Sequence, residues 1–392
     1  MHCVRGLFFF GLDLLSSKAM DLALYRKYRP KKFAEIVGQE HIVKSLQGGL
    51  ELGKTSHAYL FIGPRGTGKT TMARLLAKTI NCEKRGDENP PAGGESCNAC
   101  YVCTEFNAGR ALDLVEIDAA SNRGIDEIRN LRESVRFSPS SAKYKVYIID
   151  EVHQLTDAAF NALLKTLEEP PSHVIFILAS TEPQKIPETI ASRTQQFHFR
   201  NLTQTQVLEK LARVAKSEKL DIDQEALKAV AMSAHGSLRD AESNLAKLIN
   251  FGDKRITLAQ AQEILGFVPF KAVYDFTGLL ILKKSEEAVG FVNNLYESGI
   301  DLEEFSKSFI DHLRRLLISN LSPATFISFS GYNQEETQLI SSQARVLAKE
   351  QIVRMVKIFM KAREEMRISP IQQLPLELAV IEYFDAGNRD NN

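Results

Sequence analysis

Short apolar runs rich in β-branched residues alternate with helical patterns through the first half of the chain. Five such runs are expected to be strands, at residues 58–62, 112–117, 146–149, 174–179 and 196–199. Between the third and fourth runs, the sequence predicts a helix. Its apolar face consists of residues at i, i+3, i+4 and i+7, which are Phe160, Leu163, Leu164 and Leu167. The helix should end at Glu169-Pro170-Pro171, because proline disfavours the helical conformation in the residue before it. Strands that alternate with helices predict an α/β fold with a parallel five-stranded sheet covered on both faces.

The pattern changes after about residue 201, where the strand signals stop. Three capping boxes then precede helical patterns, at Thr203 with Gln206, Ser237 with Asp240 and Thr257 with Gln260. We therefore predict an α/β domain at 23–201, a small helical domain at 202–268 and an all-helical domain at 269–387, followed by a polar tail at 388–392.

Residues 1–22 are interpreted as an extension of unknown role. The run Leu7-Phe8-Phe9-Phe10-Gly11-Leu12 is similar to the apolar part of a secretion signal, but Asp13 interrupts it and no clear cleavage pattern follows. Met20 lies just before the first well-patterned segment, so it is an alternative start of the chain.

The composition is that of an ordinary globular protein. The 392 residues are 44% apolar and 25% charged, which excludes disordered, collagen-like and coiled-coil chains. Lys plus Arg and Asp plus Glu are both 49, so the formal net charge is zero and a basic patch for nucleic acid has to be local. No uncharged apolar run approaches the length of about 18 residues that a membrane helix needs. We expect no membrane partner.

A nucleotide-binding motif follows the first expected strand. Gly63-Pro64-Arg65-Gly66-Thr67-Gly68-Lys69-Thr70 satisfies G-x-x-x-x-G-K-[ST], and a helix is expected directly after it, at Thr71 and beyond. Glycines let backbone N–H groups surround phosphate oxygens at the start of the helix, where the helix dipole also favours an anion. Lys69 is expected to reach the β- and γ-phosphates and Thr70 to bind Mg²⁺. The alternative is a glycine-rich turn that matches by chance, which the flanking strand and helix disfavour.

Two acids follow the third expected strand. Asp150 at the carboxyl end of that strand can hold Mg²⁺, while Glu151 can polarise an attacking water. Such a pair is common at the start of a solvated loop, so alone it indicates little. Together with the phosphate loop, it predicts ATP hydrolysis.

Hydrolysis of this kind needs further polar and positive groups near the γ-phosphate. Arg193, in Ser192-Arg193-Thr194, and Arg239, at the start of a capped helix, are the candidates for an arginine finger, a group worth roughly 10³–10⁵ in rate. Thr181, at the end of the fourth strand, is the candidate sensor of the γ-phosphate. The alternatives are two surface arginines without a catalytic role and a threonine that only caps the next turn.

Cysteine usage predicts a metal centre. Of five cysteines, four fall in one stretch, Cys82, Cys97, Cys100 and Cys103, with two consecutive C-x-x-C steps. The polar insertion between the first two has little to bury, so a structural Zn²⁺ with four thiolate ligands would order it. Four buried cysteines without metal are the alternative.

In this order, these motifs resemble the gamma/tau subunits of bacterial DNA polymerase III, the ATPases of the sliding-clamp loader. Further matching phrases are Tyr28-Arg29-Pro30, Val37-Gly38-Gln39-Glu40, His57-Ala58-Tyr59-Leu60-Phe61, Glu116-Ile117-Asp118-Ala119-Ala120-Ser121 and the run from Asn161 to Pro171. Gly236-Ser237-Leu238-Arg239-Asp240 matches as well. The resemblance is dense from about Leu24 to Leu248 and thin beyond.

The resemblance implies a AAA+ ATPase domain, a helical lid at 202–268 and an oligomerisation collar from 269. It implies a cytoplasmic five-subunit loader with delta and delta-prime, in which ATP binding opens the clamp for loading on primed DNA and hydrolysis releases it. The polymerase core is a further expected partner. By resemblance, Arg193 acts in trans, Arg239 is the second sensor in cis and Thr181 is the first sensor. The adenine pocket is assigned to Tyr28, Arg29, Pro30, Val37 and Gly38.

Four departures from the family pattern matter. Thr194 stands where the family usually has cysteine, and Glu242 replaces an expected leucine near Arg239. The first two zinc cysteines are further apart than expected, although the ligand set is complete. The long tail by which the tau form contacts helicase and polymerase does not follow the collar region, which leaves that bridging role open.

Two basic stretches are candidate DNA contacts. One is Arg26-Lys27-Tyr28-Arg29-Pro30-Lys31-Lys32, and the other is a helix face with Arg129, Arg132 and Arg136. A solvated edge and an ion-paired face with Glu133 are the alternatives. Two other functions stay open at this point: a non-catalytic loader scaffold such as delta-prime, which the intact Lys69 and Asp150 disfavour, and a AAA+ DNA-remodelling motor, which the cysteine insertion disfavours.

Overall fold

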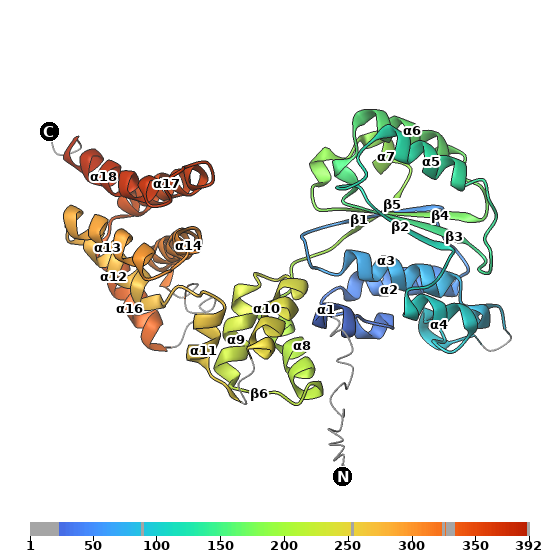
Figure 1. Ribbon diagram of the computed structural model, residues 1–392, viewed down its shortest axis with the longest axis horizontal. Coiled ribbons are helices and arrows are strands. Elements are labelled where there is room, and N and C mark those ends of the chain that lie inside the picture. The colour runs from blue at the N-terminus through green and yellow to red at the C-terminus, as the bar shows by residue number, and fades with distance from the viewer. Residues whose placement is uncertain (1–22, 88–89, 252–254, 324–325, 327–333, 390–392) are drawn as a thin grey trace, which may run out of the picture. The chain divides into compact units, whose positions relative to one another are not determined.

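The computed structural model describes residues 23–87, 90–251, 255–323, 326 and 334–389 (Figure 1). Unit 1 comprises the described residues of Met1–Ser217 with Ala234–Ala246, and unit 2 those of Glu218–Ser233 with Lys247–Asn392. The expected extension at 1–22 and residues 390–392 of the expected tail lie outside the described residues. None of the described helices is long and apolar enough to span a bilayer.

The centre of unit 1 is one parallel sheet of five strands. They are β1 (Ala58–Ile62), β2 (Leu114–Asp118), β3 (Lys145–Asp150), β4 (Val174–Ser180) and β5 (Gln195–His198), in the order β2-β3-β4-β1-β5. Each expected strand is found, although β2 begins two residues later than the apolar run and β5 one residue earlier. The predicted α/β architecture with a five-stranded parallel sheet is therefore confirmed.

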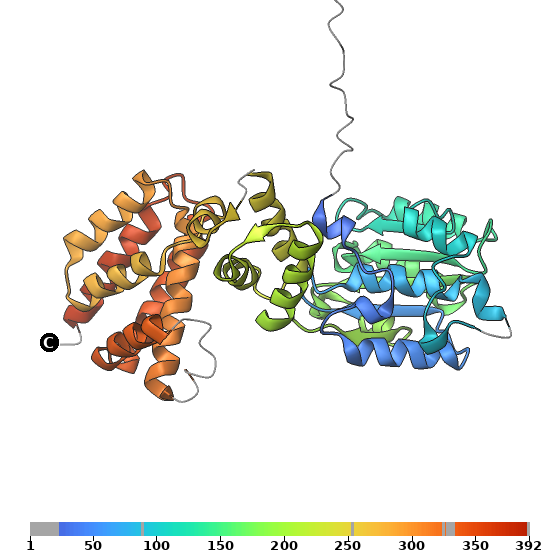
Figure 2. The same cartoon turned by 90° about the horizontal axis from the view of Figure 1, so that it is seen from below.

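Helices cover both faces of this sheet (Figure 1 and Figure 2). On one face lie α2 (Glu40–Glu51) and α3 (Lys69–Ile80), and on the other α5 (Ile125–Ser134), α6 (Asp157–Glu168) and α7 (Glu188–Ala191). The alternation of strand side chains separates two cores: Tyr59 and Phe61 of β1 pack in the first, and Ala58, Leu60 and Ile62 in the second. Both faces of the strand are apolar because both are buried.

The helix predicted before Glu169-Pro170-Pro171 is α6. The Thr156 hydroxyl accepts the Ala159 N–H at its start, and the helix ends at Glu168, two residues before the first proline. Phe160, Leu163 and Leu167 are buried against the sheet, as their spacing predicts.

Shorter helices of unit 1 flank the sheet and lead to the lid. They are α1 (Leu24–Lys27), η1 (Phe33–Glu35), η2 (Glu83–Gly86), η3 (Ala92–Gly94), α4 (Tyr101–Ala108), η4 (Val152–Gln154) and η5 (Pro183–Lys185). Two lid helices follow, α8 (Gln204–Ser217) and α10 (Leu238–Asn250). All of α8, and α10 as far as Ala246, belong to unit 1. The Thr203–Gln206 capping box makes both of its hydrogen bonds, whereas Ser237 caps α10 through one bond from Asp240 N.

Unit 2 begins with α9 (Gln224–Ser233) and α11 (Leu258–Ile264), the latter started by the Thr257–Gln260 capping box. The expectation that strands stop after residue 201 is wrong here. β6 (Asp221–Ile222) pairs in parallel with β7 (Arg255–Ile256), and Arg255 forms a 2.8 Å ion pair with Asp223 beside it. Strands of two residues are too short for an alternating pattern, so the sequence carried no signal for them.

Helices form the rest of unit 2. They are α12 (Phe270–Ile281), α13 (Ser285–Glu297), α14 (Leu302–Leu321), α16 (Gln334–Val346), α17 (Lys349–Met366) and α18 (Leu374–Arg389). Their core holds a cluster of edge-to-face rings, Phe276, Phe305, Phe309 and Phe359, with 4.7 Å between the centroids of the last two. Since α18 runs to Arg389, two residues of the expected tail belong to this helix.

Candidate nucleotide site and metal centre

The predicted catalytic side chains follow three neighbouring strands. The motif Gly63–Thr70 follows β1, Asp150 is the last residue of β3 with Glu151 directly after it, and Thr181 follows β4. Because β4 lies between β3 and β1 in the sheet, the carboxyl ends of these parallel strands meet at one edge. In open α/β sheets, ligands bind outside the carboxyl ends of the strands.

Close packing explains the glycines of the loop. Gly63 has φ 153°, and a Cβ there would lie 2.5 Å from the Phe199 carbonyl oxygen. Gly66 has φ 74° and directly contacts the Ser237 side chain. Gly68, with φ 100°, is the residue before α3. Each of the three has a positive φ, which residues with a Cβ rarely adopt, so the loop keeps this backbone conformation only with glycine.

Lys69 is the charged group at the centre of the loop. It is only 6% exposed, and its ammonium donates to the carbonyl oxygens of Gly63 at 2.7 Å and Pro64 at 2.9 Å. Burial lowers the pKa of Lys69, while the carboxylates of Glu151 and Asp150 raise it. The ammonium is thus held by the loop and lies in the field of both acids, as a phosphate-binding lysine should.

Hydrogen bonds join the ends of the three strands. The Thr70 hydroxyl donates to Asp150 Oδ2 at 2.7 Å, and the Thr181 hydroxyl donates to Glu151 Oε2 at 2.9 Å. Glu151 has φ 48°, an uncommon conformation that re-aims its side chain after the strand. The structure therefore brings together Lys69, Thr70, Asp150, Glu151 and Thr181.

The other loop residues lie as follows. Pro64 and Arg65 are exposed, and Thr71 is half-buried in the first turn of α3. Thr67 is buried, and its hydroxyl donates to the Pro64 carbonyl oxygen at 2.8 Å.

His153 is a further polar residue beside the acids. Its Nδ1 lies 3.1 Å from Ser180 Oγ and 3.4 Å from Glu151 Oε2. The sequence offered no signal for it, because a single histidine after a strand is equally common in cores.

The expected adenine segment lies against the first part of the lid. Lys210 Nζ of α8 donates to the Tyr28 carbonyl oxygen at 3.1 Å. Gly38, with φ 73°, packs directly against Leu202 and the Gln206 side chain. Arg29, Pro30 and Val37 are half-buried in the same segment. Burial lowers the pKa of Arg29, and so does Arg74 nearby.

Arg239 lies close to the loop. Leu238 N, one residue before it, donates to the Gly66 carbonyl oxygen at 3.1 Å. The exposed guanidinium of Arg239 stands 5.0 Å from the centre of the Tyr25 ring, a cation–π contact.

Arg193 makes contacts of another kind. Its guanidinium donates to Glu168 Oε1 at 2.7 Å and to the Thr189 carbonyl oxygen at 2.8 Å. In the single chain, these contacts hold Arg193 at the end of α6.

Some residues of the two basic stretches have local partners. Arg129 pairs with Asp126 at 3.0 Å, so the ion-paired alternative is right for this arginine, although its partner is not Glu133. Arg26 and Lys27 stack on the rings of Tyr25 and Tyr28, while Lys31 and Lys32 are exposed.

Glu242 of α10 is an unusual buried acid. It is 5% exposed, and its Oε1 has no hydrogen-bond partner. Burial raises the pKa of Glu242 to about 7, although Lys210 and Arg29 oppose the shift. The family pattern has a leucine at this position, and nothing in the local sequence predicts that the glutamate replacing it is buried.

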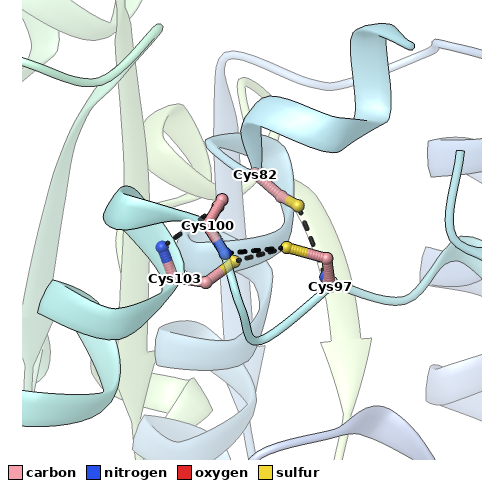
Figure 3. A group of neighbouring side chains, drawn as sticks. All are labelled: Cys82, Cys97, Cys100 and Cys103. Atoms are coloured by element: carbon pink, nitrogen blue, oxygen red, sulfur yellow. Dashed lines mark hydrogen bonds between the residues drawn. The ribbon is translucent and has the colours of Figure 1, made fainter.

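The four cysteines converge beside α3 and α4. Figure 3 shows Cys82, Cys97, Cys100 and Cys103 turned toward one another, and their Sγ atoms all lie within 4.8 Å of each other. The N–H groups of Ala99 and Cys100 donate to Cys97 Sγ at 3.4 and 3.2 Å. Such bonds favour a thiolate, the form that binds metal.

This donor set fits a structural zinc ion. Four sulfurs at about 2.3 Å from a tetrahedral Zn²⁺ are about 3.8 Å apart, close to the 3.9 Å between Cys97 Sγ and Cys103 Sγ. Burial raises the pKa of Cys82 and of Cys103, so both would favour the protonated thiol without a cation. The predicted ligands are thus brought together, with no fifth side chain from the described His, Cys, Asp and Glu residues in the group.

Three family models match successive parts of the chain. Residues 38–203 match the model described as DNA polymerase III, delta subunit. Residues 206–254 match the ATPase lid domain of a DNA polymerase III clamp loader subunit. Residues 256–388 match domain III of DNA polymerase III subunits gamma and tau.

Relatives extend the match to almost the whole chain. DNA polymerase III subunit tau of Bacillus subtilis is 40% identical over 94% of this chain, which spans 64% of that protein. DNA polymerase III subunit gamma of Buchnera aphidicola is 36% identical over 93% of this chain and 98% of its own length. Among solved structures, the Thermotoga maritima RuvB Holliday junction branch migration motor is 19% identical over 64% of this chain and 79% of its own, with a TM-score of 0.46.

Stability should depend on pH through Glu242. Its pKa is about 7 in the folded chain against an ordinary value of 4.5, so between these values the folded chain binds more protons than the unfolded one. The free energy of unfolding therefore falls as the pH rises from 4.5 to about 7 and then levels off. Glu242→Leu should remove this slope and stabilise the chain at pH 8 by roughly 1–3 kcal/mol.

Urea unfolding at pH 5 and pH 8, followed by circular dichroism, measures the effect. Asp240→Leu, at an exposed position of the same helix, is the control and should keep the wild-type slope. An unchanged slope in Glu242→Leu would show that another group titrates.

Proposed function

Because the chain belongs to the family of DNA polymerase III gamma and tau subunits, we propose that it is an ATPase subunit of the clamp loader. In this function, ATP binding prepares the sliding clamp for loading onto primed DNA, and hydrolysis releases the loaded clamp. The proposal depends on the phosphate loop of this chain and on its matches to the clamp-loader ATPase lid and to domain III of gamma and tau.

The observation that carries the proposal is the 2.7 Å hydrogen bond between Thr70 and Asp150. It joins the phosphate loop to the acid after β3, which is the pair that holds Mg²⁺ in P-loop ATPases. A chain that only served as a scaffold would have no need of this pair or of the buried Lys69. The motor alternative has no support from the family of the chain.

The phosphate loop would bind the nucleotide. Backbone N–H groups from Arg65 to Thr71 would surround the phosphate oxygens, and Lys69 would leave the two loop carbonyls to contact the β- and γ-phosphates. Thr70 and Asp150 would hold Mg²⁺, and this ion would supply positive charge to these phosphates.

Glu151 and Thr181 would handle the attacking water. In the structure, the Thr181 hydroxyl donates to Glu151 Oε2 at 2.9 Å. A γ-phosphate in the loop would offer Thr181 a second acceptor, which would leave Glu151 able to orient the water.

Two arginines would complete the charge around the γ-phosphate. Arg239, one residue after the bond between Leu238 N and Gly66 O, would act in cis. Arg193, held by Glu168 in the single chain, would act on the nucleotide of a neighbouring subunit. The adenine base would lie among Tyr28, Arg29, Pro30, Val37 and Gly38, with Lys210 holding that segment.

The partners follow from this function. They would be the delta and delta-prime subunits in a hetero-pentamer joined through the collar, the sliding clamp, primed DNA and the polymerase core, all in the cytoplasm where the chromosome is copied. Zn²⁺ on Cys82, Cys97, Cys100 and Cys103 would be structural, because four thiolates leave no open position for a substrate.

Lys69→Ala should abolish ATP binding. Two charge-assisted hydrogen bonds to phosphate, each worth about 1.5–3 kcal/mol, would be lost, which weakens binding by roughly 100-fold or more. Calorimetry with ATP and Mg²⁺ measures the affinity, and the exposed Lys54→Ala is the control. Wild-type affinity in Lys69→Ala would place the nucleotide elsewhere.

Arg193→Ala should keep ATP binding in the isolated chain and lose hydrolysis in the assembled loader by about 10³-fold or more. The DNA-stimulated ATPase rate is measured after assembly with the other subunits, a clamp and primed DNA. Arg213→Ala, an exposed arginine of α8, is the control. Normal turnover of the assembled Arg193→Ala loader would contradict a role in trans.

Cys100→Ser should lose zinc, because the three remaining thiolates no longer form a closed site. Atomic emission on the purified chain gives the metal content, which should be about one zinc per wild-type chain. Equal zinc in the wild type and Cys100→Ser would refute the ligand set.

A further inference from the structure

The four-cysteine module, defined as residues 82–103, makes polar contacts with the chain on both sides of Val37 and Gly38. Before these two residues it contacts the backbone N–H groups of Phe33 and Ala34, and after them it contacts α2. Phe33 and Ala34 lie between Tyr28-Arg29-Pro30 and Val37-Gly38. The module therefore contacts the middle of the expected base-binding segment and the helix that follows it.

Glu95 makes the contacts to the first side. Its Oε2 accepts the Phe33 N–H at 3.0 Å, and its Oε1 accepts the Ala34 N–H at 2.9 Å. Phe33 is 1% exposed and packs in the core with Ile42 and Leu46. One carboxylate thus fixes two successive backbone donors, and charge-assisted bonds of this kind are the stronger ones.

Lys78 joins the same segment to the module and to α3. This lysine, 2% exposed near the end of α3, donates to the Lys31 carbonyl oxygen at 2.6 Å and to Asn107 Oδ1 at 2.9 Å. It also donates to Asn98, which lies between Cys97 and Cys100. The helix that begins with Lys69 in the phosphate loop therefore ends with a lysine that holds the residue after Pro30.

Two contacts hold the module against α2. Gly94, with φ 63°, lies so close to the Gln47 backbone that a Cβ would be 2.9 Å from its Cα. Arg85 donates to the Leu50 carbonyl oxygen at 2.6 Å. Since α2 begins two residues after Gly38, one module holds both the middle of the segment and the helix that follows it.

We propose that the four-cysteine module positions the base-binding segment, through Glu95 and Lys78, so that the metal site sets the affinity for the adenine part of ATP. The inference rests on the proposed function, because the adenine assignment does. It makes Glu95 and Lys78 positioning residues that do not themselves contact the nucleotide.

The metal is needed because the module has little else to order it. Its buried cluster consists of the cysteines and Val102, with Phe106 packed against them. Glu95 stands two residues before Cys97, and Asn98 stands directly after it. Bound metal would fix both side chains, because metal binding supplies the folding energy of such small modules.

The test compares two ligands in three chains: wild type, Glu95→Gln and the exposed Glu83→Gln of the same module. Both substitutions remove one negative charge. In Glu95→Gln, however, the side-chain amide has only one acceptor oxygen, so its NH₂ group would face one of the two backbone N–H groups that the carboxylate accepts. Calorimetry gives the ATP affinity in the presence of Mg²⁺, and competition with ATP gives that of inorganic tripolyphosphate. Atomic emission and thermal unfolding report zinc and fold.

Glu95→Gln should bind ATP about tenfold more weakly and tripolyphosphate as the wild type does, a coupling of ordinary size. Glu83→Gln should match the wild type with both ligands. If Glu95→Gln binds ATP as tightly as Glu83→Gln does, the inference is overturned. It is also overturned if Glu95→Gln loses affinity for ATP and tripolyphosphate equally, which would indicate general damage to the fold.

Cys100→Ser gives an independent test through the metal. It should lose zinc and show the same selective loss of ATP affinity, and wild-type ATP affinity without zinc would overturn the inference. Failure of the proposed function has a different signature, since the wild type would then bind no ATP or would show no competition by tripolyphosphate.

Discussion

The buried ammonium of Lys69 is the interaction on which the arrangement of unit 1 depends. A charge that is 6% exposed has lost most of its water, so it has to be compensated by protein groups. The carbonyl oxygens of Gly63 and Pro64 do this only because the glycine loop turns them inward. The carboxylates of Asp150 and Glu151 also stabilise the ammonium electrostatically, because the strand order places the carboxyl end of β3 at the same edge of the sheet as the loop. An anion that binds in the loop exchanges those carbonyls for phosphate oxygens, so binding requires little rearrangement of the sheet.

Local patterns predicted the sheet and the loop, since each has a signal within a few residues. The strands are apolar runs, the helix α6 is periodic, and Gly63–Thr70 is a contiguous motif. Even the contact between Thr70 and Asp150, 80 residues apart, follows from the rule that parallel strand ends meet. The contact between Gly66 and Ser237 does not follow from any such rule, because it depends on how α10 docks. The same holds for Glu242 beside Lys210, where a buried acid replaces an apolar residue and only the fold reveals the burial.

The segment from Tyr28 to Gly38 shows why docking matters. Its regular structure is η1, three residues long, and a helix this short has no stability of its own. Long-range bonds therefore set its position: Lys210 from the lid at Tyr28, Lys78 from α3 at Lys31, and Glu95 from the cysteine module at Phe33. Under the proposed function, a base-binding segment held at these points would respond both to displacement of α8 and to loss of the metal.

Lys69 and Arg193 differ in how firmly the single chain holds their charges, which fits the proposal that Arg193 acts on the nucleotide of a neighbouring subunit. Lys69 is buried and bound to its own loop, so the single chain already holds the phosphate-binding charge in place. Arg193 is partly exposed and paired with Glu168, and exposed pairs of this kind contribute only about 0–1 kcal/mol. A neighbouring triphosphate, with its larger negative charge, can therefore take the guanidinium from Glu168 at little cost. Under the proposed function, one chain would suffice to bind the nucleotide, whereas rapid hydrolysis would require the assembly.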